Sequence, residues 1–404
     1  MSSHIAFFKY TMYRTIVERR DQMNKIYMDN GATSFPKAPT VSAAMCRYIE
    51  DIGTNVGRGA YENAFAAQRI IEDTRDRLAT LFNYPNSRNV IFTKNITESM
   101  NILIKGLLKQ NDHVIISPFE HNAVMRPLTS LEKEGVTYSK AGYDDDGQLI
   151  PNSIESLIQK NTKAIIMTHA SNVTGTILNL ESIGKIAKKH DLFFIIDAAQ
   201  TAGLIDVDFQ ILQADAIAFT GHKGLLGPQG TGGFIISDEL ANEVPPFIEG
   251  GTGSKSDSEV QPLYLPDKYE SGTPNTVGLF GLHAALTYLD GLGIQQLMAI
   301  EHQRTKSFIK GIEELDAIRI IGKKEIIDRT AVVSLDFSPR DNAEVAWLLE
   351  QEYGIATRVG MHCAPSAHKA MNTFPQGTVR FSFSSFTTEE EIQFALTAIK
   401  NIVD

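Results

Sequence analysis

Ionisable and amide side chains gather directly after a series of short apolar runs in this chain. Lys223 stands in Thr-Gly-His-Lys-Gly after the run 216–220, and Asp197 closes the run 193–197. A carboxylate at the end of a buried strand needs a cationic or hydrogen-bonding partner, because burying it alone is costly. A lysine in such a position is either a surface charge or the amine of a site. Other polar residues that follow such runs are Thr97, Glu120, His121, His169, Asn172, Gln200, Thr220 and His222.

The elements that must position these side chains are apolar runs alternating with amphipathic stretches. Runs that are apolar nearly throughout predict strands covered on both faces, as in a largely parallel sheet, and the alternation with helices predicts an α/β fold. Ligands of open α/β sheets bind beyond the carboxyl ends of the strands, so we expect the polar residues to share one rim. The predicted strands are 89–93, 113–117, 164–168, 193–197, 216–220 and 233–237.

The pattern changes after Pro274 and predicts a second, smaller unit. At ~150 residues per domain, a chain of 404 residues indicates two or three domains. A single long helical region is predicted at 277–315, and the Gly/Ser/Pro-rich interval 250–274 predicts a loop beside a site or an interface. We expect an N-terminal extension at 1–24, a large domain at 25–289, whose first residues could pack on the small domain, and a small α+β domain at 290–404.

Composition excludes several classes of protein. The formal net charge is −10 and no long Lys/Arg run occurs, which argues against nucleic acid or an anionic membrane as partner. No apolar run approaches the ~18 residues of a membrane helix. Two cysteines, Cys46 and Cys363, provide neither a disulfide framework nor a thiolate zinc cage. The expected location is cytoplasmic, where a free thiol survives.

One cofactor uses the polar residues at the rim as a set: pyridoxal 5′-phosphate. Its aldehyde needs a lysine amine, its ring nitrogen needs a carboxylate, and its phosphate needs hydroxyl and amide donors. Thr97 opens a predicted helix after a strand and turn, where its hydroxyl and free N–H groups could hold a phosphate. Taken alone, Thr97 would be an N-cap, and His121 and His222 would be structural histidines.

The two cysteines differ in their surroundings. Cys46 lies on the apolar face of 41–49 and is predicted to be inert packing. Cys363 lies in Arg-Val-Gly-Met-His-Cys-Ala-Pro, and positive charge on the nearby Arg358 and His362 would favour its nucleophilic thiolate. A His-Cys pair could also be half of a metal site, but no second pair stands at ligand spacing, so no metal is predicted.

The sequence resembles the class V aminotransferase family of pyridoxal-phosphate enzymes (fold type I), specifically the cysteine desulfurase branch with a short Arg-x-Gly-x-His-Cys-Ala segment. The resemblance runs from Tyr27 to the C-terminal helix. It implies a large domain with a mostly parallel seven-stranded sheet and a smaller α+β domain. The stretches that carry it are 27–33, 95–101, 120–124, 171–176, 197–200, 220–233, 270–276 and 357–365.

The resemblance implies a role for each residue around the cofactor. Lys223 would form the Schiff base, Asp197 would pair with the ring nitrogen, and Gln200 would hydrogen-bond the ring hydroxyl. His121 would stack on the ring and assist proton transfer. Thr273 would reach the phosphate from the neighbouring subunit, which implies a homodimer with shared active sites. The other phosphate ligands would be Thr97, Thr220 and His222.

The implied reaction converts L-cysteine to L-alanine. Asn172 and Arg380, with Arg358 close by, would hold the substrate carboxylate, for which an arginine fork is suited. The Cys363 thiolate would take the sulfur as a persulfide and pass it to an acceptor protein or small thiol. Arg380 could instead form a surface salt bridge on its strand.

Several alternatives stay open on the sequence. The same residues would serve a selenocysteine lyase, or an aminotransferase or β-lyase in which Cys363 is not required. A binding protein without enzymatic activity would leave Lys223 unmodified. A nicotinamide enzyme fits poorly, because the glycines of 227–233 precede a strand. Departures from the branch pattern at Gly57, Tyr61 and Met361 bear on substrate preference and persulfide transfer.

Overall fold

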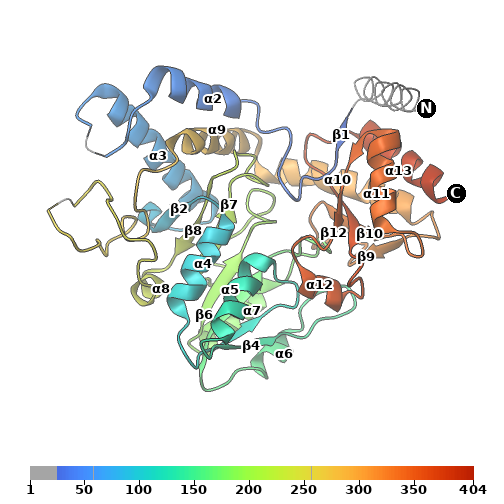
Figure 1. The fold of residues 1–404 in the computed structure, drawn as a ribbon, viewed down its shortest axis with the longest axis horizontal. Helices are drawn as coiled ribbons and strands as arrows, with labels where there is room; N and C mark the ends of the chain where they lie inside the picture. Colours follow the sequence, from blue (N-terminus) through green and yellow to red (C-terminus); the bar gives the residue numbers. More distant parts are fainter. Residues whose placement is uncertain (1–24, 58, 256) are drawn as a thin grey trace, which may run out of the picture.

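A seven-stranded sheet forms the centre of the molecule (Figure 1). The computed structural model describes residues 25–404 except 58 and 256. The strand order is β2-β8-β7-β6-β5-β3-β4, and β8 runs antiparallel to both of its neighbours while the other pairs are parallel. The predicted α/β fold with a mostly parallel seven-stranded sheet is confirmed. Its strands are β2 (Val90–Thr93), β3 (His113–Ile116), β4 (Thr137–Lys140), β5 (Thr162–Thr168), β6 (Phe193–Asp197), β7 (Ala216–Thr220) and β8 (Gly232–Ile236).

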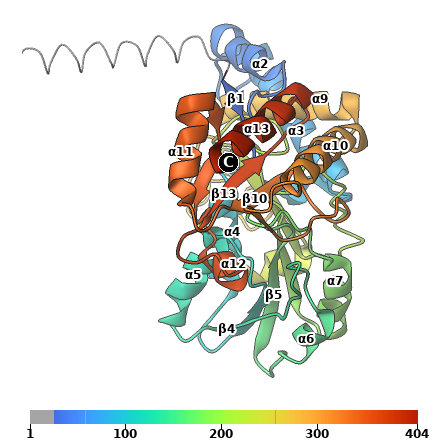
Figure 2. The same ribbon diagram turned by 90° about the vertical axis from the view of Figure 1, so that its right-hand side faces the viewer.

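Helices cover both faces of this sheet. In Figure 2, α4 and α5 lie on one side of β5, and α6 and α7 lie on the other. Because of this double cover, β6 and β7 are apolar up to their last residue, and β5 is apolar and buried over 164–167. The surrounding elements are α2 (Val41–Arg47), η1 (Tyr48–Ile52), α3 (Glu62–Leu81), η2 (Ser87–Asn89), α4 (Ile96–Leu107), α5 (Asn122–Glu132), α6 (Pro151–Glu155), α7 (Leu180–Lys189) and α8 (Asp238–Glu243).

The long helical region predicted at 277–315 consists of two helices. They are α9 (Thr276–Leu292) and α10 (Ile294–Ile312), and they meet at an angle of 83°. Gly293 between them has φ 81°, a left-handed value that favours glycine and ends a helix. Within the described residues, no helix alone is long and apolar enough to span a membrane; the bent pair α9 and α10 passes that test together by length and composition only.

The C-terminal elements stack on one end of the large sheet (Figure 2). They form a four-stranded sheet in the order β12-β13-β10-β9. The strand β1 (Ile26–Tyr27) pairs with β11, so the start of the described chain packs with its C-terminal part. The remaining elements are β9 (Arg319–Ile321), β10 (Val332–Asp336), α11 (Asn342–Tyr353), β11 (Ile355–Ala356), β12 (Arg358–Gly360), α12 (Pro365–Ala370), β13 (Thr378–Ser382) and α13 (Glu389–Val403).

The strand pairings and element bounds do not test the predicted domain boundaries. Residues 289 and 290, where the small domain was predicted to begin, lie in the last turn of α9. The predicted extension 1–24 lies outside the described residues. The division at 289–290 therefore stays a prediction.

Candidate active site

The carboxyl ends of β6 and β7 bring a buried carboxylate and a lysine amine into electrostatic contact. Asp197 is the last residue of β6 and is 2% exposed, and its Oδ1 accepts a hydrogen bond from Ala199 N at 2.9 Å. Burial raises the pKa of Asp197, and the Ala199 hydrogen bond and the positive charge of Lys223 oppose that rise. The Asp197 carboxylate and the Lys223 amine therefore influence each other's protonation.

Lys223 follows β7 in a turn and loses much of its hydration there. Burial, and next the positive charge of Arg380, lower the pKa of Lys223 from 10.5 to about 8, although Asp197 acts in the opposite direction. At neutral to mildly basic pH a sizeable fraction of the amine is consequently unprotonated. An unprotonated lysine amine is a nucleophile and a base.

Two polar atoms beside Lys223 are buried without a hydrogen-bond partner. These atoms are Oγ1 of Thr220, at the end of β7, and Nδ1 of His222. Burial, followed by the charges of Lys223 and Lys37, lowers the pKa of His222 to about 4, so the ring is neutral. Buried polar atoms in folded proteins nearly always have partners. A hydroxyl and an imidazole nitrogen left open beside a lysine fit the phosphate of pyridoxal phosphate.

His121 and Gln200 are held in place by main-chain contacts. His121 caps α5, and its Nδ1 accepts a hydrogen bond from Ala123 N at 3.0 Å, which leaves the ring proton on Nε2. Burial and then Lys223 lower the pKa of His121 to about 4. Gln200 Nε2 donates to Gly31 O at 3.0 Å. Both side chains thus have fixed orientations, and the imidazole of His121 is neutral.

Two predicted phosphate ligands lie differently from the others. Thr97 is exposed in the first turn of α4, and the N-cap is Asn95, whose Oδ1 accepts from Glu98 N at 3.0 Å, so reading Thr97 as an N-cap would have been wrong. Thr273 is exposed in the loop 250–274 and lines a hollow with Arg75, whereas Lys223 lines another cavity. Within one chain Thr273 is not brought to Lys223.

Arg380 is a nearly fully buried guanidinium in β13, with 1% of its surface exposed. Its Nη1 donates to Asn172 O at 3.2 Å, and its Nη2 contacts Asp29 Oδ1 at 2.9 Å. The other oxygen of Asp29 lies 3.4 Å from Arg358 Nε. The two predicted carboxylate-binding arginines therefore share a carboxylate that the sequence analysis did not select. Its only indication in the sequence was its place in the stretch 27–33.

Cys363 lies at the tip of a turn between β12 and α12. His362 and Cys363 have φ values of 46° and 58°, in the left-handed region that few residues adopt. The backbone of the turn is anchored from the large sheet region, because Asn122 N donates to Cys363 O at 2.8 Å and Asn172 Nδ2 donates to His362 O at 2.6 Å. The Cys363 thiol is free and exposed. The turn thus presents the Cys363 thiol next to the segments that contain Asn122 and Asn172.

One predicted source of positive charge at Cys363 is wrong. His362 is buried, and its Nε2 lies 2.9 Å from Thr378 Oγ1. Burial, followed by Arg380, lowers the pKa of His362 to about 2, so this ring is neutral. The positive charge near the thiol comes instead from arginine, since Cys363 and Arg380 interact electrostatically.

The prediction for Cys46 is also wrong. Cys46 is a free and exposed thiol on α2, not a buried filler. Val41 is the buried residue of this helix, and Ile49, on the face expected to pack, is 63% exposed. The apolar spacing of 41–49 was therefore not a sign of burial within this chain.

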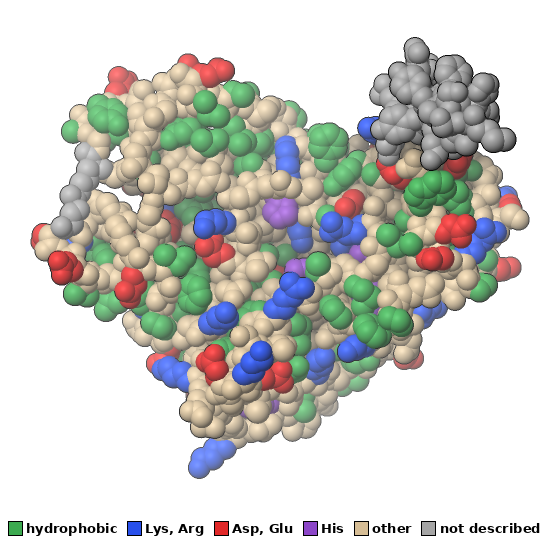
Figure 3. Space-filling model, in the orientation of Figure 1, with side chains coloured by type: hydrophobic (Ala, Val, Ile, Leu, Met, Phe, Trp, Pro, Cys, Tyr) green, Lys and Arg blue, Asp and Glu red, His purple; other side chains and the backbone are tan. Residues whose placement is uncertain are grey.

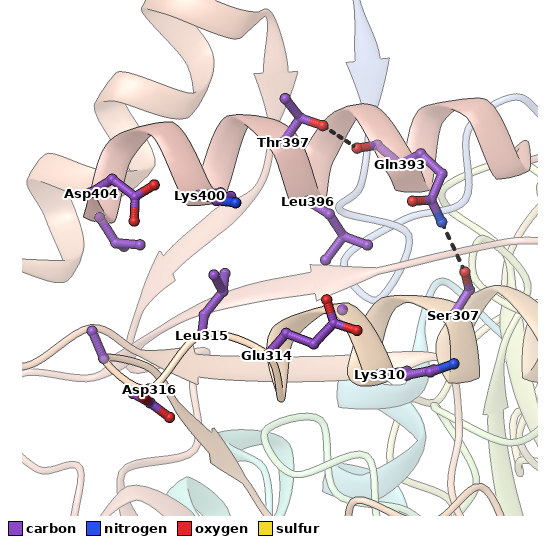
Figure 4. A pocket seen from close by; sticks show the side chains of 13 residues that line it. Ser307, Lys310, Glu314, Leu315, Asp316, Gln393, Leu396, Thr397, Lys400 and Asp404 are labelled. Atoms are coloured by element: carbon purple, nitrogen blue, oxygen red, sulfur yellow. Dashed lines mark hydrogen bonds between the residues drawn. The ribbon is translucent and has the colours of Figure 1, made fainter.

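The groove between α10 and α13 lacks the cofactor-binding residues described above. The groove between α10 and α13 contains the hydrogen bonds of Gln393 to Ser307 and of Thr397 to Gln393, and none of the predicted site residues lines it (Figure 4). Across residues 25–404 without 58 and 256, no group of three His, Cys, Asp or Glu could hold a metal ion. In Figure 3, Lys, Arg and His side chains instead reach the surface together where the C-terminal elements meet the rest of the molecule.

Comparison with known proteins agrees with this arrangement. Residues 26–394 match the family model Aminotransferase class-V. A relative from Methanothermobacter thermautotrophicus named "Probable cysteine desulfurase" is 33% identical over 397 residues, covering 96% of this chain and 98% of the relative. A relative of the same name from Pyrococcus abyssi is 34% identical over 386 residues, covering 94% of each chain.

Solved structures show the same fold. The apo structure of a cysteine desulfurase from Thermococcus onnurineus NA1 has a TM-score of 0.88 and 32% identity, covering 94% of each chain. The cysteine desulfurase CsdA (S-sulfonic acid) from Escherichia coli has a TM-score of 0.84 and 26% identity, covering 96% of this chain and 98% of that one. The motifs, the fold and these matches agree, and the chain belongs to the aminotransferase class-V family.

Proposed function

We propose that the protein is a pyridoxal-phosphate-dependent cysteine desulfurase that converts L-cysteine to L-alanine and takes the sulfur on Cys363 as a persulfide. The observation that carries the proposal is an exposed thiol on a turn anchored through Asn122 and Asn172 to the elements around Lys223. The names of relatives that match over nearly the whole chain support it.

The residues around Lys223 fit the cofactor. When bound, pyridoxal phosphate supplies an electron sink that acidifies the Cα–H bond of an amino acid. Lys223 would hold it covalently, Asp197 would face its ring nitrogen, and the open Thr220 Oγ1 and His222 Nδ1 would receive its phosphate. The remaining proposed cofactor contacts are Thr97, His121, Gln200 and, from a second subunit of a homodimer, Thr273.

The amine of Lys223 moves the proton at the substrate Cα. A lowered pKa suits this task, because general base catalysis works best when the pKa of the base lies near the operating pH. Asp197 lies in electrostatic reach of Lys223 and balances positive charge in the site. His121 is neutral and carries its proton on Nε2, so it can donate a hydrogen bond from that atom into the site and assist proton transfer by orienting the groups it contacts.

The substrate carboxylate is held and oriented by Arg380, Asn172 and Arg358. Cys363 performs the sulfur transfer. The Cys363 thiolate attacks the substrate sulfur: an S–S bond forms, the substrate C–S bond breaks, and its electron pair remains with the three-carbon fragment. Protonation of that fragment yields L-alanine. The persulfide is then passed to an acceptor protein or a small thiol, and we place the enzyme in the cytoplasm.

The pKa of Lys223 sets the pH at which cofactor-free protein takes up pyridoxal phosphate. Because that pKa is lowered to about 8, the unprotonated amine is scarce well below pH 8 and predominates above it. We expect the uptake rate, followed by the visible absorption of the protein, to rise with pH and level off above pH 8. A rate still rising toward pH 10.5 would show that the amine is not desolvated.

The function is tested by incubating the enzyme with L-cysteine, and in parallel with L-selenocysteine, while alanine and peptide masses are measured. We expect alanine together with one added sulfur on the Cys363 peptide. Cys46 is a built-in control, because it is exposed but lies on α2. Alanine with no sulfur added at Cys363 would contradict the mechanism, and alanine from L-selenocysteine alone would indicate a selenocysteine lyase.

A further inference from the structure

Asp29 bridges two arginines from adjacent strands of the C-terminal sheet. Arg358 and Arg380 are partners in the β12–β13 register, and Asp29 gives one carboxylate oxygen to each of them, at 3.4 and 2.9 Å. The backbone of Asp29 is itself fixed, because it forms a bridge with Ser382 and its carbonyl accepts from the Tyr27 hydroxyl at 3.1 Å. The carboxylate therefore stands at a defined place between the two guanidinium groups.

The contact between Asp29 and Arg380 is incomplete. A carboxylate that matches the arginine fork uses two parallel N–H donors, but Arg380 offers Nη2 to Asp29 and Nη1 to a backbone carbonyl. Its Nε is buried and has no hydrogen-bond partner. The Arg380 guanidinium thus has an unused donor in a site where every unused donor is costly.

A buried guanidinium also needs a counter-charge when no ligand is present. Arg380 is 1% exposed, and isolating a charge at that depth is strongly unfavourable. Arg358, by contrast, retains 47% of its side-chain exposure and can hold a carboxylate with help from water. The two arginines therefore differ in how much they depend on Asp29.

We propose that Asp29 is a resident carboxylate that neutralises Arg380 in the free enzyme, yields it to the carboxylate of the incoming amino acid, and stays paired with Arg358. Asp29 is then a positioning and specificity residue. A thiol without a carboxylate cannot replace Asp29 on Arg380, so the exchange selects substrates that carry a carboxylate. The inference rests on the proposed function for its substrate.

Asp29→Asn tests the exchange, because it keeps the shape of the side chain and removes the competing charge. We expect the KM for L-cysteine to fall about fivefold, with kcat nearly unchanged. The dissociation constant of the holoenzyme for L-alanine, measured by calorimetry, should fall by a similar factor. Asp29→Glu, which restores the charge, should return both values toward those of the wild type.

A matched control separates this role from a structural one. Asp336 forms an ion pair with Arg319 at 3.1 Å in the same sheet, and Asp336→Asn should leave KM unchanged. If Asp29 merely anchors β1, Asp29→Asn would raise KM, lower kcat and lower the melting temperature together, and the proposal would be overturned.

A double-mutant cycle that combines Arg358→Gln with Asp29→Asn tests whether the two side chains act on KM through each other. Arg358→Gln should raise KM several-fold, in part because Asp29 then has Arg380 as its remaining partner, and the effect should become clearly smaller when Asn replaces Asp29. An Arg358→Gln effect on KM that is unchanged in the double variant would refute the exchange.

The binding of L-alanine is measured without any desulfuration. Tighter L-alanine binding in Asp29→Asn, together with no turnover of L-cysteine, would therefore reject the proposed function and retain the exchange.

Discussion

Replacement of Cys363 by serine is expected to lower alanine formation from L-cysteine by about 100-fold or more. Serine preserves the size of the side chain, but its hydroxyl does not ionise near neutral pH and cannot carry a sulfur as a persulfide. The turn should survive, because its anchors are the main-chain oxygens of residues 362 and 363, which accept from Asn172 and Asn122. Alanine release is measured under saturating L-cysteine, together with the visible absorption of the bound cofactor.

Cys46→Ser is the matched control for this experiment. Cys46 is the other free thiol of the chain, it is exposed, and it lies on α2. We expect this variant to retain wild-type turnover. Unchanged alanine formation in Cys363→Ser would show that Cys363 does not take the sulfur. An oxo acid formed in place of alanine, by the wild type and by Cys363→Ser alike, would favour an aminotransferase or a β-lyase that does not need a thiol.

Most strands of the large sheet could be predicted from the sequence, because a strand that is buried on both faces consists mainly of apolar residues. β6 and β7 are apolar up to their last residue, β5 is apolar over 164–167, and the strands predicted from these runs overlap the observed ones. β4 lies at the edge of the sheet and has the partly exposed sequence TYSK, so no apolar run marks it in the sequence. The break between α9 and α10 depends on the positive φ of Gly293, and the spacing of apolar residues cannot predict such a backbone angle.

The site was predictable where its residues follow strand ends and unpredictable where it depends on distant contacts. Lys223 and Asp197 were expected at one rim because each stands at or just after the end of a strand of the sheet, and in the structure their charges act on each other. The contact of Asp29 with Arg380 joins positions 351 residues apart, and local patterns contain no information about it. The neutral state of His362 depends in the same way on burial and on the Arg380 charge.

Replacement of Lys223 by alanine is expected to lower kcat by about 1000-fold or more, since the variant lacks the amine that moves the Cα proton. Lys223→Arg should be similarly inactive, because a guanidinium stays protonated and cannot act as a base. Lys268→Met is the matched control: burial lowers the pKa of Lys268 as well, yet its Nζ donates to Ala241 O, and we expect a loss of less than about tenfold.

Chemical rescue distinguishes a missing base from a disturbed fold. Ethylamine added to Lys223→Ala should restore part of the turnover, with a rate that rises with the concentration of the unprotonated amine. The pH profile of the rescued reaction should then follow the pKa of the added amine, which is near that of an ordinary lysine, instead of the value of about 8 for Lys223. Rescue that was absent at every pH, or undiminished activity in Lys223→Ala, would mean that another group takes the proton. The lowered pKa of Lys223 would then reflect burial without a catalytic purpose.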